Sequence, residues 1–358
     1  MKQLKINNLN PVLKNVVFVI SKSEIGGAQA WVTHLKEILE SEYNVFLVTS
    51  DYGWLTDFFE PERVIIIPGL ASMGRPDTIF KIRTAFKKFN AHVVISNSAS
   101  AGLYSRIAKL IYRHKHIYVS HGWSCLYNGG RLKPIFCFIE KMLSIITDKI
   151  LCVSDNDQYK AMKLIGINPR KTLVIRNGVK SFEKKEFINE SKKILFVGRM
   201  VHPKRPDLLA EVAVRFPLVQ FYFVGDGPLL PELKRKYESI KNIFFLGEIK
   251  NFKSFKEYDL FVLSSDSEGL PMSAVEAATA NLPLLLSDVG GCCELILRNS
   301  EGRTNGLLFN NHVTDLTEKI NIILNDYLNY YKVANEISHQ FEITNNKDKY
   351  LDLMHRVE

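Results

Sequence analysis

The stretch LFVLSSDSEGLPMSAVEA, residues 260–277, contains one complete unit of the fold. Its first four residues are apolar without interruption, as in a strand that is buried on both faces of a parallel sheet. A polar loop follows, and Pro271 stands where a helix begins, at a position that proline tolerates. The segment is therefore predicted to form a strand, a loop and a helix in succession.

The same alternation of short apolar runs and amphipathic stretches extends along most of the chain. Helical stretches such as Ala28–Glu40 and Pro206–Arg215 separate the runs. The predicted strands form two series: Val16–Ile20, Val45–Thr49, Val64–Ile67, Val93–Ser96, Ile117–Ser120 and Ile150–Val153, and then Lys193–Val197, Gln220–Val224, Ile243–Phe245, Leu260–Leu263 and Pro283–Leu286. Repeated strand–helix units predict an α/β protein with doubly wound parallel sheets.

A polar, charged stretch separates the two series. Ser181–Lys192 has no strand pattern and is predicted to be a linker. We therefore expect one Rossmann-like domain over residues 1–182 and a second over residues 183–334, and the length of 358 residues suits two domains. Two such domains that face a central cleft would present the carboxyl ends of their strands to it, where ligands bind in these sheets.

Composition limits the classes of protein and of partner. No stretch reaches the roughly 18–20 consecutive apolar residues of a membrane-spanning helix, and the five cysteines form no C-x-x-C pair, so we expect a cytoplasmic protein with reduced thiols. The formal net charge of +9 suits a nucleic acid, an anionic membrane or a phosphorylated ligand. Nucleic acid is disfavoured, because the cations accompany glycine-rich turns and not aromatic stacking platforms.

The loop and helix after the strand Leu260–Leu263 carry the strongest chemical signal. The backbone N–H groups near Pro271–Ala274 form a ready anion site at a helix N-terminus. Glu268 lies before the helix, and Glu276 lies about five residues into it, roughly 7–8 Å along its axis. The two carboxylates can therefore meet groups on either side of a bound diphosphate, as in a nucleotide sugar. The alternative is an ordinary capped helix with an exposed glutamate.

Two further strand ends in the second half carry glycines. Gly198 and Arg199 follow a strand, and Lys204 comes five residues after Arg199. The forked guanidinium of an arginine and the point charge of a lysine together suit a diphosphate. A basic surface patch would have the same composition. Gly225–Pro228 forms a second such turn.

In the first half, two features follow predicted strands. Gly26 and Gly27 would let backbone N–H groups approach an anion at a helix N-terminus, or they form only a tight turn. His121 follows Ile117–Ser120 and faces the expected cleft, where it could act as a base or contact a substrate, or be purely structural. Asp155-Asn156-Asp157 spells a metal-binding pattern, but after Ser154 these residues are predicted to cap a helix.

Taken in order, these motifs resemble the retaining glycosyltransferases of family 4, which have the GT-B fold. The likeness covers most of the chain, and the E-x7-E spacing inside EGLPMSAVEA is its most specific element. The matching elements are Gly26–Gln29, His121–Trp123, Cys152–Ser154, Arg176–Val179, Gly198-Arg199 with Lys204, Gly225–Pro228, Glu268–Glu276, and Val289–Gly291 with Glu294. One departure is His202–Pro206, where members of the family often have Lys-Gly.

The resemblance implies roles for individual residues. Arg199 and Lys204 would bind the diphosphate, Glu268 would lie by the sugar, and Glu276 would hold the ribose. The loop of Gly26 and Gly27 would lie near the phosphates, and His121 at the reaction centre. Gly269, Leu270 and Pro271 beside Glu268 would also contact the donor, and backbone near Gly247–Lys250 would meet the base. The resemblance also implies that a last helix, 335–358, returns to the first domain.

The resemblance also implies the reaction. A sugar would move from a nucleotide diphosphate, expected to be uridine diphosphate, to a hydroxyl of a glycan or lipid-linked acceptor, with retention, in bacterial surface-polysaccharide biosynthesis. No metal or other cofactor is implied, because cations and helix N-termini would neutralise the leaving diphosphate. Two alternatives stay open: a sugar-nucleotide epimerase of the same fold, and a nucleotide-sugar-binding module without catalysis.

Basic and apolar residues mix in the first half, above all in Arg131–Lys149. A core helix with charged outer positions is slightly favoured there. A basic amphipathic face would instead suit anionic lipid headgroups and a peripheral contact with the inner face of the cell membrane.

Overall fold

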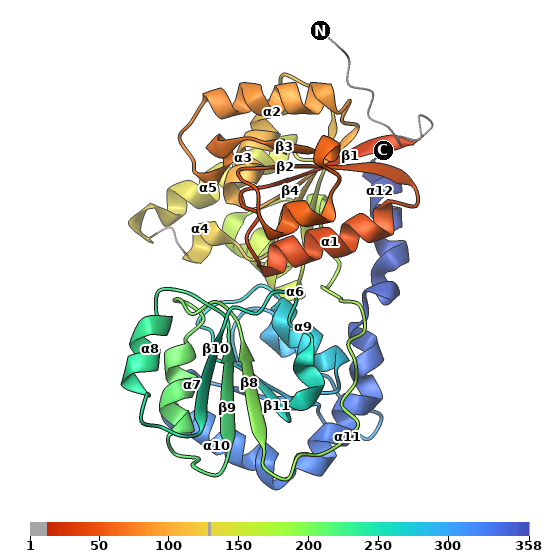
Figure 1. Cartoon of the computed structure of the whole chain (residues 1–358). Coiled ribbons are helices and arrows are strands. Elements are labelled where there is room, and N and C mark those ends of the chain that lie inside the picture. The colour runs from red at the N-terminus through yellow and green to blue at the C-terminus, as the bar shows by residue number, and fades with distance from the viewer. Residues whose placement is uncertain (1–12, 128–129, 358) are drawn as a thin grey trace. The chain divides into compact units, whose positions relative to one another are not determined.

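The computed structural model describes residues 13–127 and 130–357, and these form two compact units (Figure 1). The first unit ends at Arg176 and takes up the chain again from Asn346, and the second covers Asn177–Asn345. The sequence predicted these boundaries at 182/183 and 334/335. Within the described ranges, no helix has the length and apolarity needed to cross a membrane.

The first unit is built on a seven-stranded parallel sheet in the order β3-β2-β1-β4-β5-β6-β7. Its strands are β1 (Lys14–Ile20), β2 (Tyr43–Thr49), β3 (Val64–Ile66), β4 (Val93–Asn97), β5 (Lys115–Ser120), β6 (Lys149–Cys152) and β7 (Thr172–Val174). Its helices are α1 (Gly27–Leu39), α2 (Asp77–Lys88), α3 (Ala99–Ala108), α4 (Ser124–Tyr127), α5 (Lys133–Ile146), α6 (Asp155–Lys160) and α12 (Lys347–Val357).

Successive residues of β1 show why this strand is apolar throughout. Val17 and Val19 pack in a cluster with residues of α2 and α3, while Phe18 between them meets Trp31 of α1, with ring centroids 6.4 Å apart. Successive side chains of a strand point to opposite faces, so helices cover both faces of this sheet. The doubly wound architecture predicted from the sequence is confirmed.

The C-terminal helix α12 belongs to the first unit. Its Tyr350 is buried and accepts a 3.1 Å hydrogen bond at its hydroxyl from the indole Nε1 of Trp31 in α1. The return begins at Asn346, later than the predicted residue 335, because the preceding residues bond to the second unit. There, Val179 donates to the carbonyl of Phe341 and accepts from the N–H of Ile343.

The second unit contains a six-stranded parallel sheet in the order β10-β9-β8-β11-β12-β13. Its strands are β8 (Lys193–Val197), β9 (Gln220–Val224), β10 (Ile243–Gly247), β11 (Leu260–Leu263), β12 (Leu284–Ser287) and β13 (Gly306–Phe309). Its helices are α7 (Pro206–Ala213), α8 (Leu230–Lys236), α9 (Met272–Thr279), α10 (Val313–Asn325) and α11 (Tyr327–Ile337).

The prediction that Ser181–Lys192 is a linker is wrong, because this segment packs on the second unit. Lys185 in its middle is buried, and its ammonium lies 3.3 Å from a carboxylate oxygen of buried Asp259. Asp259 also accepts hydrogen bonds from the Asn189 side chain and the Lys193 N–H. The segment is therefore part of the second unit despite its polar composition, because its lysine pairs with a buried carboxylate.

The prediction that Arg131–Lys149 forms a core helix with charged outer positions is also wrong for α5. Its Glu140 and Ser144 are buried, whereas Ile135, Phe138 and Ile145 are exposed. The inward side of α5 thus carries Glu140 and Ser144 together with the apolar Leu143, while many of its apolar residues face solvent.

Candidate active site

In the second unit, the predicted phosphate-site residues follow β8 and β11, which are neighbours in the sheet. The chain runs from β8 outward through β9 and β10, then crosses to β11 on the other side of β8. The carboxyl ends of β8 and β11 therefore flank the topological switch point, where ligands bind in open parallel sheets. Gly198–Arg205 follows β8, and Ser264–Pro271 follows β11.

Glycines let these loops approach one another more closely than other residues could. A Cβ atom on Gly225 would lie 1.9 Å from the carbonyl oxygen of Gly198, and one on Gly290 would lie 1.9 Å from that of Glu268. Both glycines also have positive φ, +138° and +56°. Only glycine satisfies both conditions, so the loops at this edge form one packed layer.

Lys204 and Glu268 meet directly at this edge. The lysine ammonium lies 2.5 Å from a carboxylate oxygen of Glu268, whose side chain is only 8% exposed. The Lys204 side chain remains partly open to solvent, and Arg199 is exposed at the start of the same loop. The structure thus brings together two of the residues that were predicted from motifs 64 positions apart.

The N-terminus of α9 completes the anion-binding features of this edge. Pro271 is its N-cap, no side chain caps it, and no acidic residue lies in its first turn. The first N–H groups of a helix have no partner within the helix, and they attract anions. The preceding loop is held in place because Asn177 donates to the carbonyl of Leu270 at 2.9 Å and Gly291 donates to that of Gly269 at 2.8 Å.

Glu276 lies within α9 and is partly buried. Burial raises the pKa of its carboxyl to about 8, so the protonated acid predominates at neutral pH in the unliganded protein. A protonated carboxyl can both donate and accept a hydrogen bond, and a carboxylate only accepts.

The loop His202–Pro206, which departs from the family pattern, keeps a defined shape. Arg205 occupies a left-handed conformation, with φ of 50° and ψ of 47°, and its carbonyl accepts from the Ser264 hydroxyl at 2.6 Å. Its guanidinium pairs with Asp207 at 3.0 Å and Asp266 at 3.4 Å. The additional charge is therefore balanced locally by aspartates, in contrast to Lys204, which pairs with the predicted site residue Glu268.

In the first unit, the switch point lies between β1 and β4, and Gly26 and Gly27 follow β1. Gly26 is the N-cap of α1, and Gly27 is the first residue of this helix, which has no side-chain cap and no acidic residue in its first turn. The preceding turn is fixed by buried Ser23, whose N–H donates to Asp51 at 3.0 Å. The glycine pair therefore lies at an open helix N-terminus after a strand, as the sequence predicted.

His121 follows β5, next to β4 in the same sheet, and is enclosed by neighbours. Its Nε2 atom lies 2.9 Å from the Asn97 side-chain oxygen, and its ring meets Trp31 edge-on at 5.3 Å. With the amide oxygen of Asn97 facing it, Nε2 donates this hydrogen bond and Nδ1 is the ring acceptor. Burial lowers the pKa of His121 to about 4, so the ring is neutral at pH 7. Asn97 was missed from sequence, although it is a polar residue at the end of an apolar strand.

Ser154 is the N-cap of α6, and Asp155, Asn156 and Asp157 form the first turn of this helix and do not cap it. The Ser154 hydroxyl accepts a 3.0 Å hydrogen bond from the N–H of Asp157, and Asp155 pairs with Arg176. Across residues 13–127 and 130–357, no group of three or more histidine, cysteine or acidic side chains is arranged to hold a metal ion.

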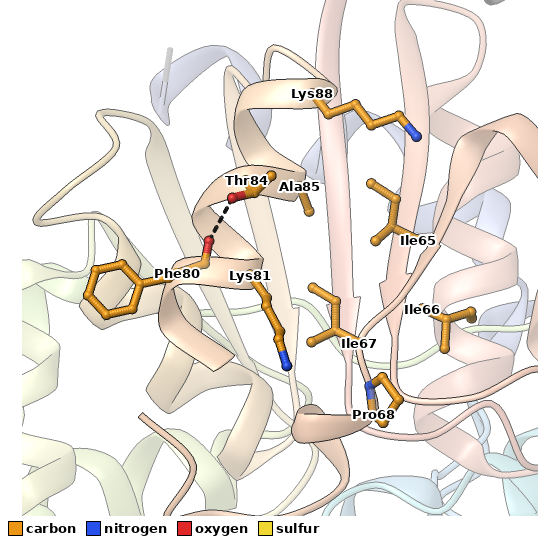
Figure 2. Close-up of a pocket in the computed structure, with 9 residues that line it drawn as sticks. All are labelled: Ile65, Ile66, Ile67, Pro68, Phe80, Lys81, Thr84, Ala85 and Lys88. Atoms are coloured by element: carbon orange, nitrogen blue, oxygen red, sulfur yellow. Dashed lines mark hydrogen bonds between the residues drawn. The ribbon is translucent and has the colours of Figure 1, made fainter. Parts of the chain in front are cut away.

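A hollow of about 540 Å³ lies elsewhere in the first unit, between β3 and α2 (Figure 2). Isoleucines of the β3 strand line one side, and Phe80, Lys81 and Thr84 of α2 line the other. It lies at the edge strand of the sheet, two strands from β1, and holds no acidic residue. We therefore place the candidate site at the carboxyl edges and not in this hollow.

Both halves of the chain match known protein families. Residues 179–341 match the family described as "Glycosyl transferases group 1", and residues 25–181 match "Glycosyltransferase Family 4". The chain is 48% identical over 342 residues to the O-antigen biosynthesis glycosyltransferase WbnH of Escherichia coli, covering 96% of this chain and 99% of the relative. The chain belongs to the same glycosyltransferase family as this relative, and its residues 179–341 carry the group 1 domain.

More distant relatives support the same fold. The UDP-Gal:alpha-D-GlcNAc-diphosphoundecaprenol alpha-1,3-galactosyltransferase of Escherichia coli is 26% identical over 357 residues, covering 88% of this chain and 90% of the relative. The crystal structure of Anabaena HepE in complex with UDP and glucose matches with a TM-score of 0.80 at 16% identity, covering 96% of this chain and 99% of that one. The fold predicted from the sequence, GT-B with two Rossmann-like domains, is confirmed.

Proposed function

We propose that this glycosyltransferase moves a sugar from a uridine diphosphate donor to a hydroxyl group of a lipid-linked or glycan acceptor during O-antigen assembly. The ion pair of Lys204 and Glu268, beside Arg199 and the open N-terminus of α9, carries the proposal. The relatives described as an O-antigen glycosyltransferase and as a galactosyltransferase acting on a diphosphoundecaprenol-linked sugar support the donor and acceptor classes.

The residues of this edge contact different parts of the donor. Arg199, Lys204 and the first N–H groups of α9 stabilise the negative charge that grows on the leaving diphosphate. Glu268 lies by the donor sugar, backed by the loop of Gly269, Leu270 and Pro271. Glu276 holds the ribose hydroxyls. Because cations and N–H groups balance the leaving charge, we infer that turnover needs no metal and survives a chelator.

The transfer proceeds with retention. The bond from the sugar C1 to the diphosphate oxygen breaks, the acceptor oxygen bonds to C1 from the same face, and the acceptor proton passes to the leaving diphosphate. His121 is neutral at physiological pH, so it contributes a hydrogen bond to the sugar or acceptor and not a positive charge. Gly26 and Gly27 offer the open N-terminus of α1 to a phosphate.

Incubation of the purified protein with a panel of nucleotide sugars tests the proposal, with and without a diphospholipid-linked sugar acceptor. We expect uridine diphosphate release that depends on the acceptor and an α-linked product from an α-linked donor. Conversion of the donor sugar without acceptor would instead identify an epimerase. Donor binding without any turnover would identify a binding module.

A further inference from the structure

The outward side of α5 carries an apolar stripe that the transfer reaction does not use. Its members recur at helical spacing of three or four residues, so they share one face. The stripe consists of Leu132, the N-cap of α5, followed by Ile135, Phe136, Phe138, Ile139, Met142 and Ile145, and all seven side chains are exposed. Phe138 is 60% exposed and Ile145 is 65% exposed, although apolar residues of surface helices normally pack inward.

A buried ion pair fixes this unusual orientation. Arg106 of α3 is fully buried and donates to both carboxylate oxygens of Glu140, at 2.8 and 3.2 Å. Its guanidinium also lies 4.3 Å from the centre of the Tyr118 ring. Turning α5 to bury the stripe would break this pair and leave Arg106 without its counter-charge, which is unfavourable in a buried site.

A second contact holds the end of the helix. Lys109, the C-cap of α3, donates to the carbonyl of Ile146 at 2.9 Å and pairs with Asp148. The middle and the C-terminal end of α5 are thus both tied to α3 (Figure 1), and the stripe stays outward as part of the folded structure.

The exposed charged residues within the segment 131–146 have one sign. Arg131, Lys133 and Lys141 are exposed beside the stripe, whereas Glu140, the acidic residue of α5, is turned inward and paired. A second copy of this chain would bring the same cations to the contact and be repelled. An anionic lipid surface provides both the phosphate groups and the apolar depth that such a face matches.

We propose that the apolar stripe of α5 inserts into the surface of an anionic lipid bilayer while Arg131, Lys133 and Lys141 contact lipid phosphates. This inference goes beyond the proposed transfer and is tested apart from it, because vesicle binding is measured without a donor sugar. It places the first unit at the surface where a lipid-linked acceptor would be held.

Flotation of the full chain with vesicles tests this surface. Vesicles of phosphatidylcholine with 30 mol% phosphatidylglycerol, about a third anionic, would be compared at low salt with phosphatidylcholine alone. We expect the wild type to bind the anionic vesicles. The affinity for these vesicles should fall at least about tenfold in Phe138→Ser/Ile145→Ser. It should fall about fivefold for each cation removed in Lys133→Gln/Lys141→Gln. Leu218→Ser/Leu328→Ser is the matched control, since both leucines are exposed in the second unit, and it should bind like the wild type.

A second variant provides a direct measure of insertion. Phe138→Trp keeps the apolar face, so its additional fluorescence should shift to the blue on contact with anionic vesicles, relative to the wild type. Equal binding of the serine and control variants, or equal binding to neutral and anionic vesicles, would overturn the proposal. So would self-association that is lost in Phe138→Ser/Ile145→Ser without any vesicle binding, because the stripe would then be a contact between copies.

Discussion

The carboxyl edges of the two sheets differ in how they are built. In the second unit, glycines pack the loops into one layer that presents Lys204, Glu268 and the N-terminus of α9. In the first unit, the edge presents an open helix N-terminus at Gly26 and a neutral His121 that is held by aromatic and amide neighbours. One edge is organised around charge and the other around shape and neutral hydrogen bonding, as expected for a diphosphate-binding half and an acceptor-binding half.

The largest expected effect is on turnover at the charged edge. Glu268→Gln removes the charge but keeps the shape, so kcat should fall about 10²–10³-fold, the size typical for the loss of a group that stabilises the transition state. Steady-state kinetics with the preferred donor measures this effect. Uridine diphosphate affinity should change far less, and a change confined to KM would contradict a role for Glu268 at the sugar.

The packing of the two edges can be compared through matched glycine substitutions. Gly225→Ala would force a Cβ to within 1.9 Å of a backbone oxygen at positive φ, so the free energy of unfolding should fall by roughly 2–4 kcal/mol. Gly26→Ala meets only the flexible end of the Gln29 side chain, in extended backbone, and should change it by less than about 1 kcal/mol. Denaturant unfolding measures both. Equal losses would contradict a difference in packing between the edges.

His121→Ala tests the uncharged edge. One hydrogen bond to the substrate is lost, so kcat/KM should fall roughly 10–100-fold. Because the pKa of His121 is lowered to about 4, the ring is neutral above pH 5, and its titration should not change the wild-type rate between pH 5.5 and 8. A histidine-dependent step near pH 6.5 in the rate profile, absent from the variant, would show that the ring acts in its charged form.

The last comparison concerns Glu276. Its folded pKa of about 8 lies above the usual value near 4.5, so the folded state binds a proton that the unfolded state releases between these pH values. This residue therefore lowers wild-type stability progressively as pH rises from about 4.5 to 8. Glu276→Gln should have a higher Tm than the wild type at pH 8 and a similar Tm at pH 4. Parallel pH profiles would contradict the raised pKa.

Most of the fold could be predicted from the sequence because buried parallel strands are continuous apolar runs. All eleven runs correspond to strands, within a few residues at their ends. The two strands that were missed, β7 and β13, are short edge strands with partly exposed residues. A strand that is covered on fewer sides needs fewer apolar residues, so its pattern is weak.

Other features could not be predicted, because they depend on partners far along the chain. Arg131–Lys149 has the composition of a core helix, and only the partner of Glu140, Arg106 34 positions earlier, determines which side faces inward. Lys185 lies in a polar stretch, and its buried partner is 74 positions away. For the candidate site, turns and spacing located Lys204 and Glu268, but their direct contact required the register of β8 beside β11.

The most direct test of the charged edge is the affinity of the protein for uridine diphosphate. Calorimetric titration of the wild type would be compared with Lys204→Ala and with Lys133→Ala, a matched loss of one exposed lysine on α5. Losing a charged hydrogen bond to the diphosphate should weaken binding roughly 10–150-fold in Lys204→Ala and leave Lys133→Ala unchanged. Equal affinity of all three folded proteins would contradict the assignment of the donor diphosphate to the loops after β8 and β11.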